Sequence, residues 1–364
     1  MDVAGESLSG GKVMKFSLST LAIGASRLFL STGTGLAAAE SAPPPAIAFR
    51  QDDAKGQMQV LIGGKEALVY VYSKDWDLPH LFPIRSPSGK SMTVERTEPY
   101  PHHRSFWFAD TVVLGKERPA NDALGNQVSL TNTVELAGNR RVSFYFALES
   151  GTGDKKNLQP PFRDRVRHVA FTEQRPGAGK AQLGLKLVWE MDDGKTPVLD
   201  EARQMRIVAL GEGEYLLDIT FTLKASYGEV TFKSDGAHYA WPYVRMNSDF
   251  NTNGSGLLVN SEGGTAQAGT HDKPARWVDF SRTGVPDAEG LALFSHPSNP
   301  QPHSWLTRDY GTFGPRREAA RNGKPFTLKT GETISTRCGV LVHKGDVKSG
   351  RVAERFQAYA DGKL

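Results

Sequence analysis

The residues with the greatest capacity for chemistry stand together in the stretch 99–108, which reads Pro-Tyr-Pro-His-His-Arg-Ser-Phe-Trp-Phe. It holds two imidazoles, His102 and His103, one guanidinium, Arg104, and aromatic side chains that include Trp107. Imidazoles transfer protons near neutral pH, and guanidinium groups bind carboxylates and sulfates through forked hydrogen bonds. Because successive side chains of a strand point to opposite faces, we expect one histidine to serve a site while its neighbour packs or bonds to backbone.

Two further stretches carry side chains of the same kinds. Residues 290–314 contain a loop with three prolines, and residues 235–245 add a carboxylate, a histidine and another guanidinium. Proline stiffens a loop and so lowers the entropy lost when polar groups are held in place. The candidates within residues 290–314 are His296, Asn299, His303, Trp305, Arg308 and Asp309. The candidates within residues 235–245 are Asp235, His238, Trp241, Tyr243 and Arg245.

These residue types fit a carbohydrate site. Aromatic faces stack on sugar rings, and arginine or asparagine side chains hold hydroxyls, uronates or sulfates. We therefore assign substrate contacts to the aromatic and arginine candidates, which include Arg104 and Trp107. We assign the same role to all the candidates of residues 290–314. Mutarotation or epimerisation needs an acid and a base at the sugar ring, whereas a lyase needs a base and a nearby cation. We assign the proton-transfer roles to His102, His103, His238 and Asp235. Hydrolysis by paired carboxylates has less support, because the acids of these stretches are few.

Two alternatives remain open. The histidines 102, 103, 238, 296 and 303 could converge on zinc, copper or iron, but adjacent histidines on a strand diverge and no His-x-His pair occurs. We therefore predict no cofactor and keep a divalent metal at the histidine cluster as the rival. The second alternative is a sugar-binding β-sandwich without turnover, which needs the aromatic and arginine side chains but not several histidines.

Period-two alternation predicts the strands that carry these residues. Residues 141–148, 182–190 and 214–223 place apolar side chains on one face, and turn-rich segments separate them. Helical periodicity occurs only near the C-terminus, where Val352 and its neighbours follow Ser349 as the expected cap. The sequence thus predicts an all-β protein, a large antiparallel β-sandwich with a short C-terminal helix, as one domain over residues 45–362.

Composition excludes several classes of protein. The net charge of the 364-residue chain is only +4 and its basic residues are scattered, so we expect no nucleic-acid partner. The one cysteine, Cys338, cannot form an intramolecular disulfide and is expected in the core.

The apolar segment 16–36 precedes three alanines, which predicts an export signal over residues 1–39, with residues 1–13 ahead of the true start. An export signal implies a periplasmic or extracellular location. No later segment approaches the about 20 apolar residues of a membrane span.

Several motifs together also indicate a resemblance to a known family. They are His-His-Arg and Trp-Phe within 102–108, residues 275–280, His-Pro-Ser-Asn-Pro at 296–300, residues 305–313, and the ends Gly331-Glu332 and Val342-His-Lys-Gly345. In this order they resemble the PmoA-like family, a group of mostly uncharacterised bacterial proteins labelled "methane oxygenase PmoA". That family looks like a relative of the galactose-mutarotase-type β-supersandwich, which implies a carbohydrate context rather than methane oxidation by a multi-helix membrane enzyme. The stretch 235–245 departs from the family pattern, which has a shorter glycine-rich segment before the arginine.

Overall fold

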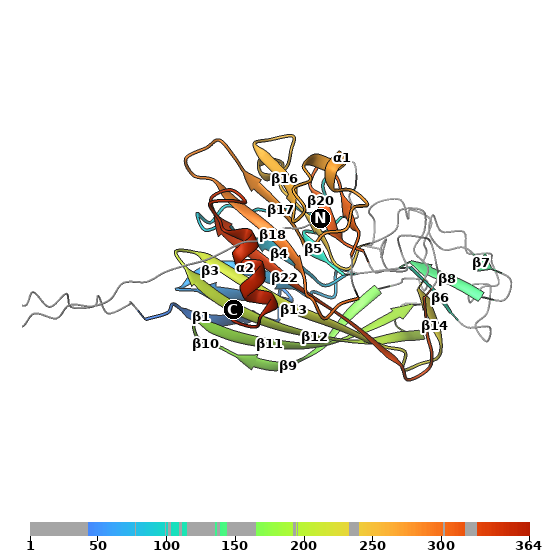
Figure 1. Ribbon diagram of the computed structural model, residues 1–364. Helices are drawn as coiled ribbons and strands as arrows, with labels where there is room; N and C mark the ends of the chain where they lie inside the picture. The colour runs from blue at the N-terminus through green and yellow to red at the C-terminus, as the bar shows by residue number, and fades with distance from the viewer. Residues whose placement is uncertain are drawn as a thin grey trace, which may run out of the picture. The chain divides into compact units, whose positions relative to one another are not determined.

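Alternation of apolar and polar residues builds long antiparallel strands that pair into sheets (Figure 1). The computed structural model describes residues 43–364 except 77, 99, 101–102, 109–110, 115–134, 137–138, 144–164, 192–193, 195, 233–239, 301–302 and 317–325, and it gives only the backbone at 111–114, 135–136, 139–143 and 191. Residues Pro43–Leu364 form one compact unit.

Among the described residues, the larger of two long sheets has nine strands. Their spatial order is β10 (Gly177–Ala178), β1 (Ala46–Asp52), β2 (Gln57–Ile62), β3 (Lys65–Val71), β4 (His80–Ile84), β5 (Phe106–Trp107), β15 (Tyr243–Arg245), β20 (Thr312–Pro315) and β19 (Trp305–Thr307). The sheet therefore brings strands from residues 46–107 next to strands from residues 243–315.

The second long sheet has eight strands in the described part of the chain. Their order is β16 (Gly256–Asn260), β17 (Trp277–Arg282), β18 (Glu289–Ser295), β22 (Thr333–Lys344), β13 (Glu214–Lys224), β12 (Thr196–Gly211), β11 (Lys180–Met191) and β9 (Arg165–Arg175). A five-stranded sheet follows the order β21 (Phe326–Leu328), β14 (Val230–Phe232), β6 (Thr111–Leu114), β8 (Asn139–Ser143) and β7 (Glu135–Leu136). Every pairing described is antiparallel.

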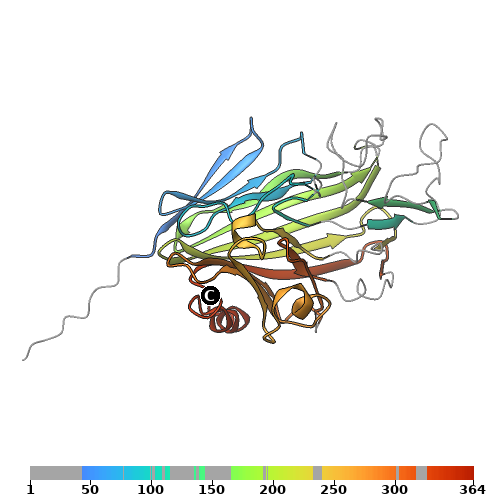
Figure 2. The ribbon, with the colours of Figure 1, turned by 90° about the horizontal axis from the view of Figure 1, so that it is seen from above.

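The two long sheets enclose the main core, and Figure 2 shows the blue and cyan strands over the green ones. Strand β13 illustrates the packing, because Leu217, Ile219 and Phe221 face inward while Leu216 faces the other way. The Tyr215 hydroxyl crosses the core and donates to the carbonyl of Ala67 at 3.0 Å. Burial of these side chains provides the main drive for folding.

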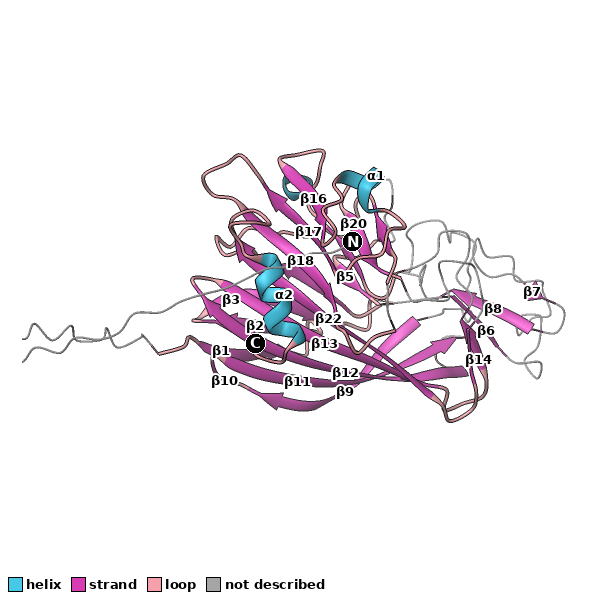
Figure 3. Cartoon of the chain, viewed as in Figure 1, coloured by secondary structure: helices cyan, strands magenta, loops and turns pink. Residues whose placement is uncertain are grey.

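Helix α2 (Val352–Ala360) lies over part of the outer face of the eight-stranded sheet (Figure 3). Val352, Phe356 and Tyr359 share one face of this helix and pack on outward residues of β13, β18 and β22. The other helices of the described residues are the short α1 (Ala266–Thr270) and the 3-10 helix η1 (Ser248–Phe250). None of these helices is long and apolar enough to cross a membrane.

The expected fold class, an all-β antiparallel sandwich with a short C-terminal helix, is confirmed. Strands β11 and β13 contain the predicted segments 182–190 and 214–223. Cys338 is buried on β22 as expected, and burial raises the pKa of its thiol well above the usual value. The expected export signal lies outside the described residues.

Candidate functional site

Three chemically capable side chains from distant parts of the chain meet at one point. Nδ1 of His103 lies 3.4 Å from Oγ1 of Thr312, and Nη1 of Arg245 donates to the same hydroxyl oxygen at 3.3 Å. All three residues are buried, and His103 is 4% exposed. The threonine hydroxyl therefore links an imidazole to a guanidinium beneath the surface.

Two tyrosine rings lie over this polar centre. The ring of Tyr100, which is 36% exposed, stacks on His103 at 5.0 Å between centroids and lies 5.3 Å from the half-buried ring of Tyr310. The guanidinium carbon of Arg245 stands 4.4 Å from the Tyr310 ring centroid, within cation–π range. We name His103, Thr312, Arg245, Tyr100 and Tyr310 together the His103 cluster.

The Tyr310 hydroxyl keeps its proton at neutral pH. Burial raises its pKa above the ordinary tyrosine value, and Tyr100 adds to that effect. A hydrogen bond with Thr312 and the positive charges of Arg245 and Arg308 oppose it. A protonated phenol can donate a hydrogen bond or a proton to a bound molecule.

The register of three neighbouring strands creates the cluster. Arg245 on β15 stands opposite Thr312 on β20, and Tyr243 stands opposite Trp107 on β5. Residues directly opposite in an antiparallel pair lie on one face, so their side chains meet. A turn then delivers the histidine, because the backbone N–H of His103 donates to the Tyr100 carbonyl at 2.9 Å.

A tight turn between β19 and β20 presents Tyr310. The backbone N–H of Gly311 donates to the Arg308 carbonyl at 2.8 Å, and Gly311 has a φ of +99° that side-chain-bearing residues rarely adopt. Asp309 fastens the turn to α1, since the backbone N–H of Gln267 donates to its Oδ1 at 2.8 Å. The Asp309 carboxylate therefore holds the turn, although we expected it to contact substrate.

Arg308 lies beside Tyr310 and against a histidine that the sequence did not single out. Its Nη1 stands 2.8 Å from Nε2 and 3.0 Å from Nδ1 of His271, and it donates to the Thr307 carbonyl at 3.0 Å. Burial, and then the charge of Arg308, lowers the pKa of His271 to about 4. His271 is therefore a neutral hydrogen-bond acceptor at pH 7.

Two predicted sugar-stacking residues lie under the cluster instead of at its surface. The rings of Trp107 and Tyr243 stack at 4.9 Å with 12° between their planes, and both side chains are buried. Trp107 also contacts the imidazole of His103, with 5.3 Å between centroids. They support the histidine from below.

The remaining aromatic candidates and Arg104 are also buried. Trp305 is 0% exposed and its indole N–H donates to the Ala275 carbonyl at 2.8 Å, and Trp241 packs against core phenylalanines. The guanidinium carbon of Arg104 lies 5.6 Å from the centroid of the Trp76 ring. These side chains shape the interior around the site.

The histidines of the proline-rich loop belong to a separate group of contacts. Nδ1 of His303 lies 2.7 Å from Oγ of Ser295, and Asn299 donates to the same oxygen at 3.2 Å and to the Arg337 carbonyl at 2.6 Å. Burial lowers the pKa of His303 to about 4. His296 is half-buried, and its ring meets the edge of the Tyr359 ring at 5.2 Å.

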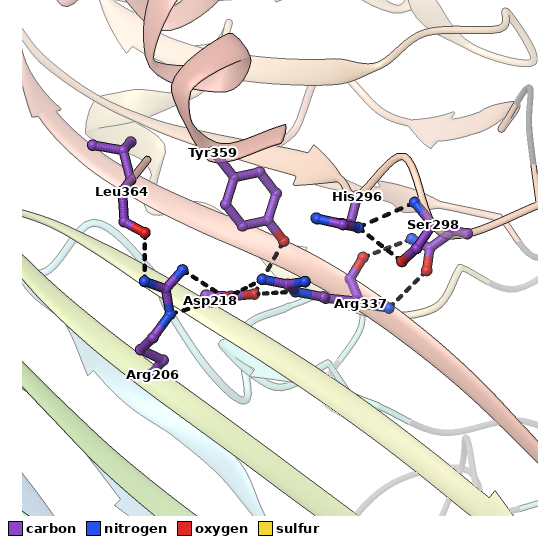
Figure 4. Close-up of polar contacts among 8 residues, drawn as sticks. Arg206, Asp218, His296, Ser298, Arg337, Tyr359 and Leu364 are labelled. Atoms are coloured by element: carbon purple, nitrogen blue, oxygen red, sulfur yellow. Dashed lines mark hydrogen bonds and ion pairs between the residues drawn. The ribbon is translucent and has the colours of Figure 1, made fainter. Parts of the chain in front are cut away.

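Next to His296, an ionic network attaches α2 to the sheet (Figure 4). Asp218 accepts from Arg337 at 2.7 and 2.8 Å, from Arg206 at 3.0 Å and from the Tyr359 hydroxyl at 3.1 Å. Burial acts to raise the pKa of Asp218, but the two arginines outweigh it and lower that pKa. Each charge has a partner, so this network serves the packing of the helix.

Three of the four residues given proton-transfer roles, His102, His238 and Asp235, lie outside the described residues. Their roles stay predictions. Within the described part of the chain, no group of three or more His, Cys, Asp or Glu side chains could hold a metal ion.

Sequence reasoning missed Tyr100, Tyr310, Thr312 and His271 as site residues. The first two stand inside motifs that were singled out, and an exposed aromatic next to a predicted histidine or arginine is a usable signal. Nothing in the local sequence distinguishes Thr312, because its role depends on strand pairing with Arg245.

Comparison with solved structures finds similarity to proteins that process carbohydrates. The GH36 α-galactosidase AgaB from Geobacillus stearothermophilus is 8% identical with a TM-score of 0.42, over 83% of this chain and 42% of that one. An α-galactosidase from Lactobacillus brevis is 11% identical with a TM-score of 0.35, over 83% of this chain and 40% of that one. A polysaccharide lyase is 11% identical with a TM-score of 0.33, over 83% of this chain and 33% of that one. The chain spans less than half the length of each.

Comparison with protein families gives one match, to a family of unknown function, DUF6807, over residues 57–357. The matched family is DUF6807 and not the PmoA-like family that the motifs suggested. The expectation that the family has no assigned function is confirmed. No curated protein matches the chain.

Proposed function

This chain belongs to DUF6807, a family of unknown function, and we propose that it binds a carbohydrate at the His103 cluster and transfers a proton to or from it. The observation that carries the proposal is the Thr312 hydroxyl, which joins His103 and Arg245 beneath two tyrosine rings.

The residue types and their depth support a sugar as the ligand. Tyr100 and Tyr310 reach the surface and offer ring faces to the C–H groups of a pyranose. Thr312 and Arg245 lie below them and supply hydrogen bonds of the kind that sugar hydroxyls accept. Aromatic rings near the surface and polar groups beneath them would give a bound sugar both affinity and orientation.

The same groups support proton-transfer chemistry. His103 is the candidate base, and Tyr310, whose raised pKa keeps the phenol protonated, is the candidate acid. Arg245 supplies positive charge for an oxyanion that forms during the reaction. Epimerisation, mutarotation and β-elimination all begin with such a step.

Hydrolysis by two carboxylates has weaker support. Asp309 binds the backbone of α1, and Asp279 is buried against His343 at 2.9 Å. Glycosidases need two carboxyl groups that flank the scissile bond.

A non-catalytic carbohydrate-binding protein is the second candidate. His103 lies between the rings of Tyr100 and Trp107 and is almost fully buried, which also suits a purely structural imidazole. In that case the tyrosines bind sugar and no product forms.

Export to the periplasm or the outside of the cell, and kinship with PmoA-like proteins, are further parts of the proposal. Export is supported by the apolar segment before Ala37-Ala38-Ala39, and the kinship by the His-His-Arg and His-Pro-Ser-Asn-Pro motifs.

A glycan screen with the full chain tests the proposal. The assay incubates neutral and acidic oligosaccharides with wild-type protein, His103→Gln and His296→Gln, and follows anomer exchange by NMR and product formation by mass spectrometry. We expect His103→Gln to lower turnover at least about 100-fold, in line with general acid–base catalysis, and His296→Gln to keep it. Binding without any turnover favours the second candidate, and the absence of both binding and turnover contradicts the proposal.

A further inference from the structure

Arg308 carries a positive charge that the described structure does not neutralise. Its polar contacts are with the neutral imidazole of His271 and with the Thr307 carbonyl, and neither of them carries a negative charge. No carboxylate of the described residues lies within 4 Å of its guanidinium nitrogens. A half-buried guanidinium without an opposite charge attracts an anion more strongly than one exposed to water.

The nearest acids are engaged elsewhere. Asp272 lies 3.4 Å from His271 but pairs with Arg316 at 2.8 Å. Asp309, the next residue along the chain, points to the backbone N–H of Gln267 on α1. Within the described residues no acid is left for Arg308, so a bound molecule can supply the anion.

The position of Arg308 relates this charge to the His103 cluster. Arg308 and Tyr310 stand in the same turn, which the backbone N–H of Gly311 closes by donating to the Arg308 carbonyl at 2.8 Å. The guanidinium carbon of Arg245 stands 4.4 Å from the Tyr310 ring centroid, and the charges of both arginines act on the Tyr310 hydroxyl. A sugar that stacks on Tyr310 brings its substituents within reach of them.

The guanidinium is also held in place before any ligand arrives. Nη1 is fixed by His271 and by the Thr307 carbonyl, and the turn that carries Arg308 is fastened to α1 through Asp309. Nε and Nη2 make no hydrogen bond within the described structure, which leaves one edge of the fork for a ligand. Pre-organisation of this kind lowers the entropy cost of binding.

We infer that Arg308 is the anion-binding residue of the His103 cluster, and that the carbohydrate bound there carries a carboxylate or a sulfate group; this rests on the proposed function. Carboxylates and sulfates share the forked acceptor geometry that a guanidinium fits. Among proton-transfer reactions, β-elimination and epimerisation of uronates suit such a substrate, because the carboxylate acidifies the neighbouring C–H group. In the elimination that proton moves to the base, the adjacent C–O bond breaks, its oxygen takes a proton from the acid, and a carbon–carbon double bond remains.

The test is a glycan array that presents each neutral oligosaccharide beside its uronate and its sulfate ester. The full chain is compared as wild type, Arg308→Gln, Arg308→Lys and Arg175→Gln. The last variant removes the same charge from an exposed arginine that pairs with Glu173 on β9. Thermal unfolding of each variant identifies any loss of folding.

We expect wild-type protein to bind at least one acidic glycan about 10-fold more tightly than its neutral counterpart. In Arg308→Gln the ratio of the affinity for the acidic glycan to that for the neutral one falls close to one. Arg308→Lys keeps part of the preference for the acidic glycan, and Arg175→Gln keeps the full preference. A preference for uronates identifies a carboxylate and a preference for sulfate esters identifies a sulfate, and either supports the inference.

Three results contradict the inference and differ in what they leave standing. Equal affinity for neutral and acidic glycans overturns the role of Arg308 and leaves the carbohydrate site. If the ratio of acidic to neutral affinity falls as far in Arg175→Gln as in Arg308→Gln, the preference for acidic glycans comes from the overall charge of the protein. Binding of no glycan at all overturns the proposed function itself.

Discussion

His103 and Thr312 are 209 residues apart in the sequence, yet Nδ1 of the histidine lies 3.4 Å from Oγ1 of the threonine. Strands β5, β15 and β20 lie next to one another in the nine-stranded sheet, and this order brings the two residues together. The sheet thus joins a proline-flanked loop from the first third of the chain to a hairpin from its last quarter.

The Thr312 hydroxyl should be necessary for the arrangement of the His103 cluster. Thr312→Val keeps the shape of the side chain but removes the group that His103 and Arg245 share. We expect the affinity for a bound glycan to fall about 10-fold, and the free energy of unfolding to fall by about 1–2 kcal/mol because buried polar atoms lose a partner. Calorimetric titration and urea unfolding measure the two effects.

Thr231→Val is the matched control for that prediction. Thr231 lies on β14 and shares a hydrogen bond with Thr327 on the exposed side of the five-stranded sheet. An equal loss of glycan affinity in both variants would show that the Thr312 hydroxyl has no special role.

The fold could be predicted in its main features from alternation alone. Leu183, Leu185 and Leu187 recur every second residue and form the buried face of β11. The expected cap of helix α2, Ser349, is wrong, because another hydrogen-bond partner competes for its hydroxyl. Its hydroxyl instead donates to Asp346 at 2.6 Å, and Arg351, in the left-handed conformation, precedes the helix.

The site could be predicted only in part. His103, Arg245 and Arg308 were identified by residue type, but alternation does not say which face of a strand reaches the surface. The structure has Trp107 and Trp305 in the interior, whereas Tyr310 is half-buried. The pairing of β15 with β20 depends on long-range register, which a local pattern cannot reveal.

The buried pair His343 and Asp279 should make stability depend on pH. Burial acts to lower the pKa of His343, but the Asp279 carboxylate, 2.9 Å away, and the Lys344 carbonyl outweigh it and raise that pKa. A raised pKa means that the protonated histidine stabilises the fold fully below about pH 6.5, its unfolded value. This stabilisation is lost as the pH rises through the folded pKa.

Asp279→Asn tests this pair, because it removes the charge and leaves the imidazole buried. We expect the free energy of unfolding at pH 6 to fall by about 3 kcal/mol, and the difference from wild type to narrow at higher pH. Urea unfolding between pH 6 and 9 measures it, with the exposed Asp287→Asn, which pairs with Lys90, as control. A difference that stays constant with pH would rule out a protonated His343.

His271 should titrate far below an ordinary histidine. Burial and the Arg308 guanidinium lower its pKa to about 4, so it is neutral at pH 7. Because the folded pKa is below the unfolded one, this residue costs stability as the pH falls from about 6.5 toward 4. Nitrogen-15 NMR of the histidine side chains follows the titration, and Arg308→Gln should raise the pKa. Protonation of His271 near pH 6.5 in the wild type would contradict the combined effect of its burial and of Arg308.

The most direct measurement is a calorimetric titration of the tightest-binding glycan from the array into wild-type protein, Tyr310→Ala and Tyr227→Ala. Tyr227 is an exposed tyrosine away from the cluster whose hydroxyl donates to Asp200 at 3.0 Å, so its removal controls for the loss of a surface ring. If a sugar stacks on the His103 cluster, Tyr310→Ala weakens binding about 10-fold or more and Tyr227→Ala leaves the dissociation constant unchanged. If Tyr310→Ala binds as tightly as wild type, or if both variants weaken binding equally, the carbohydrate site is not at the His103 cluster.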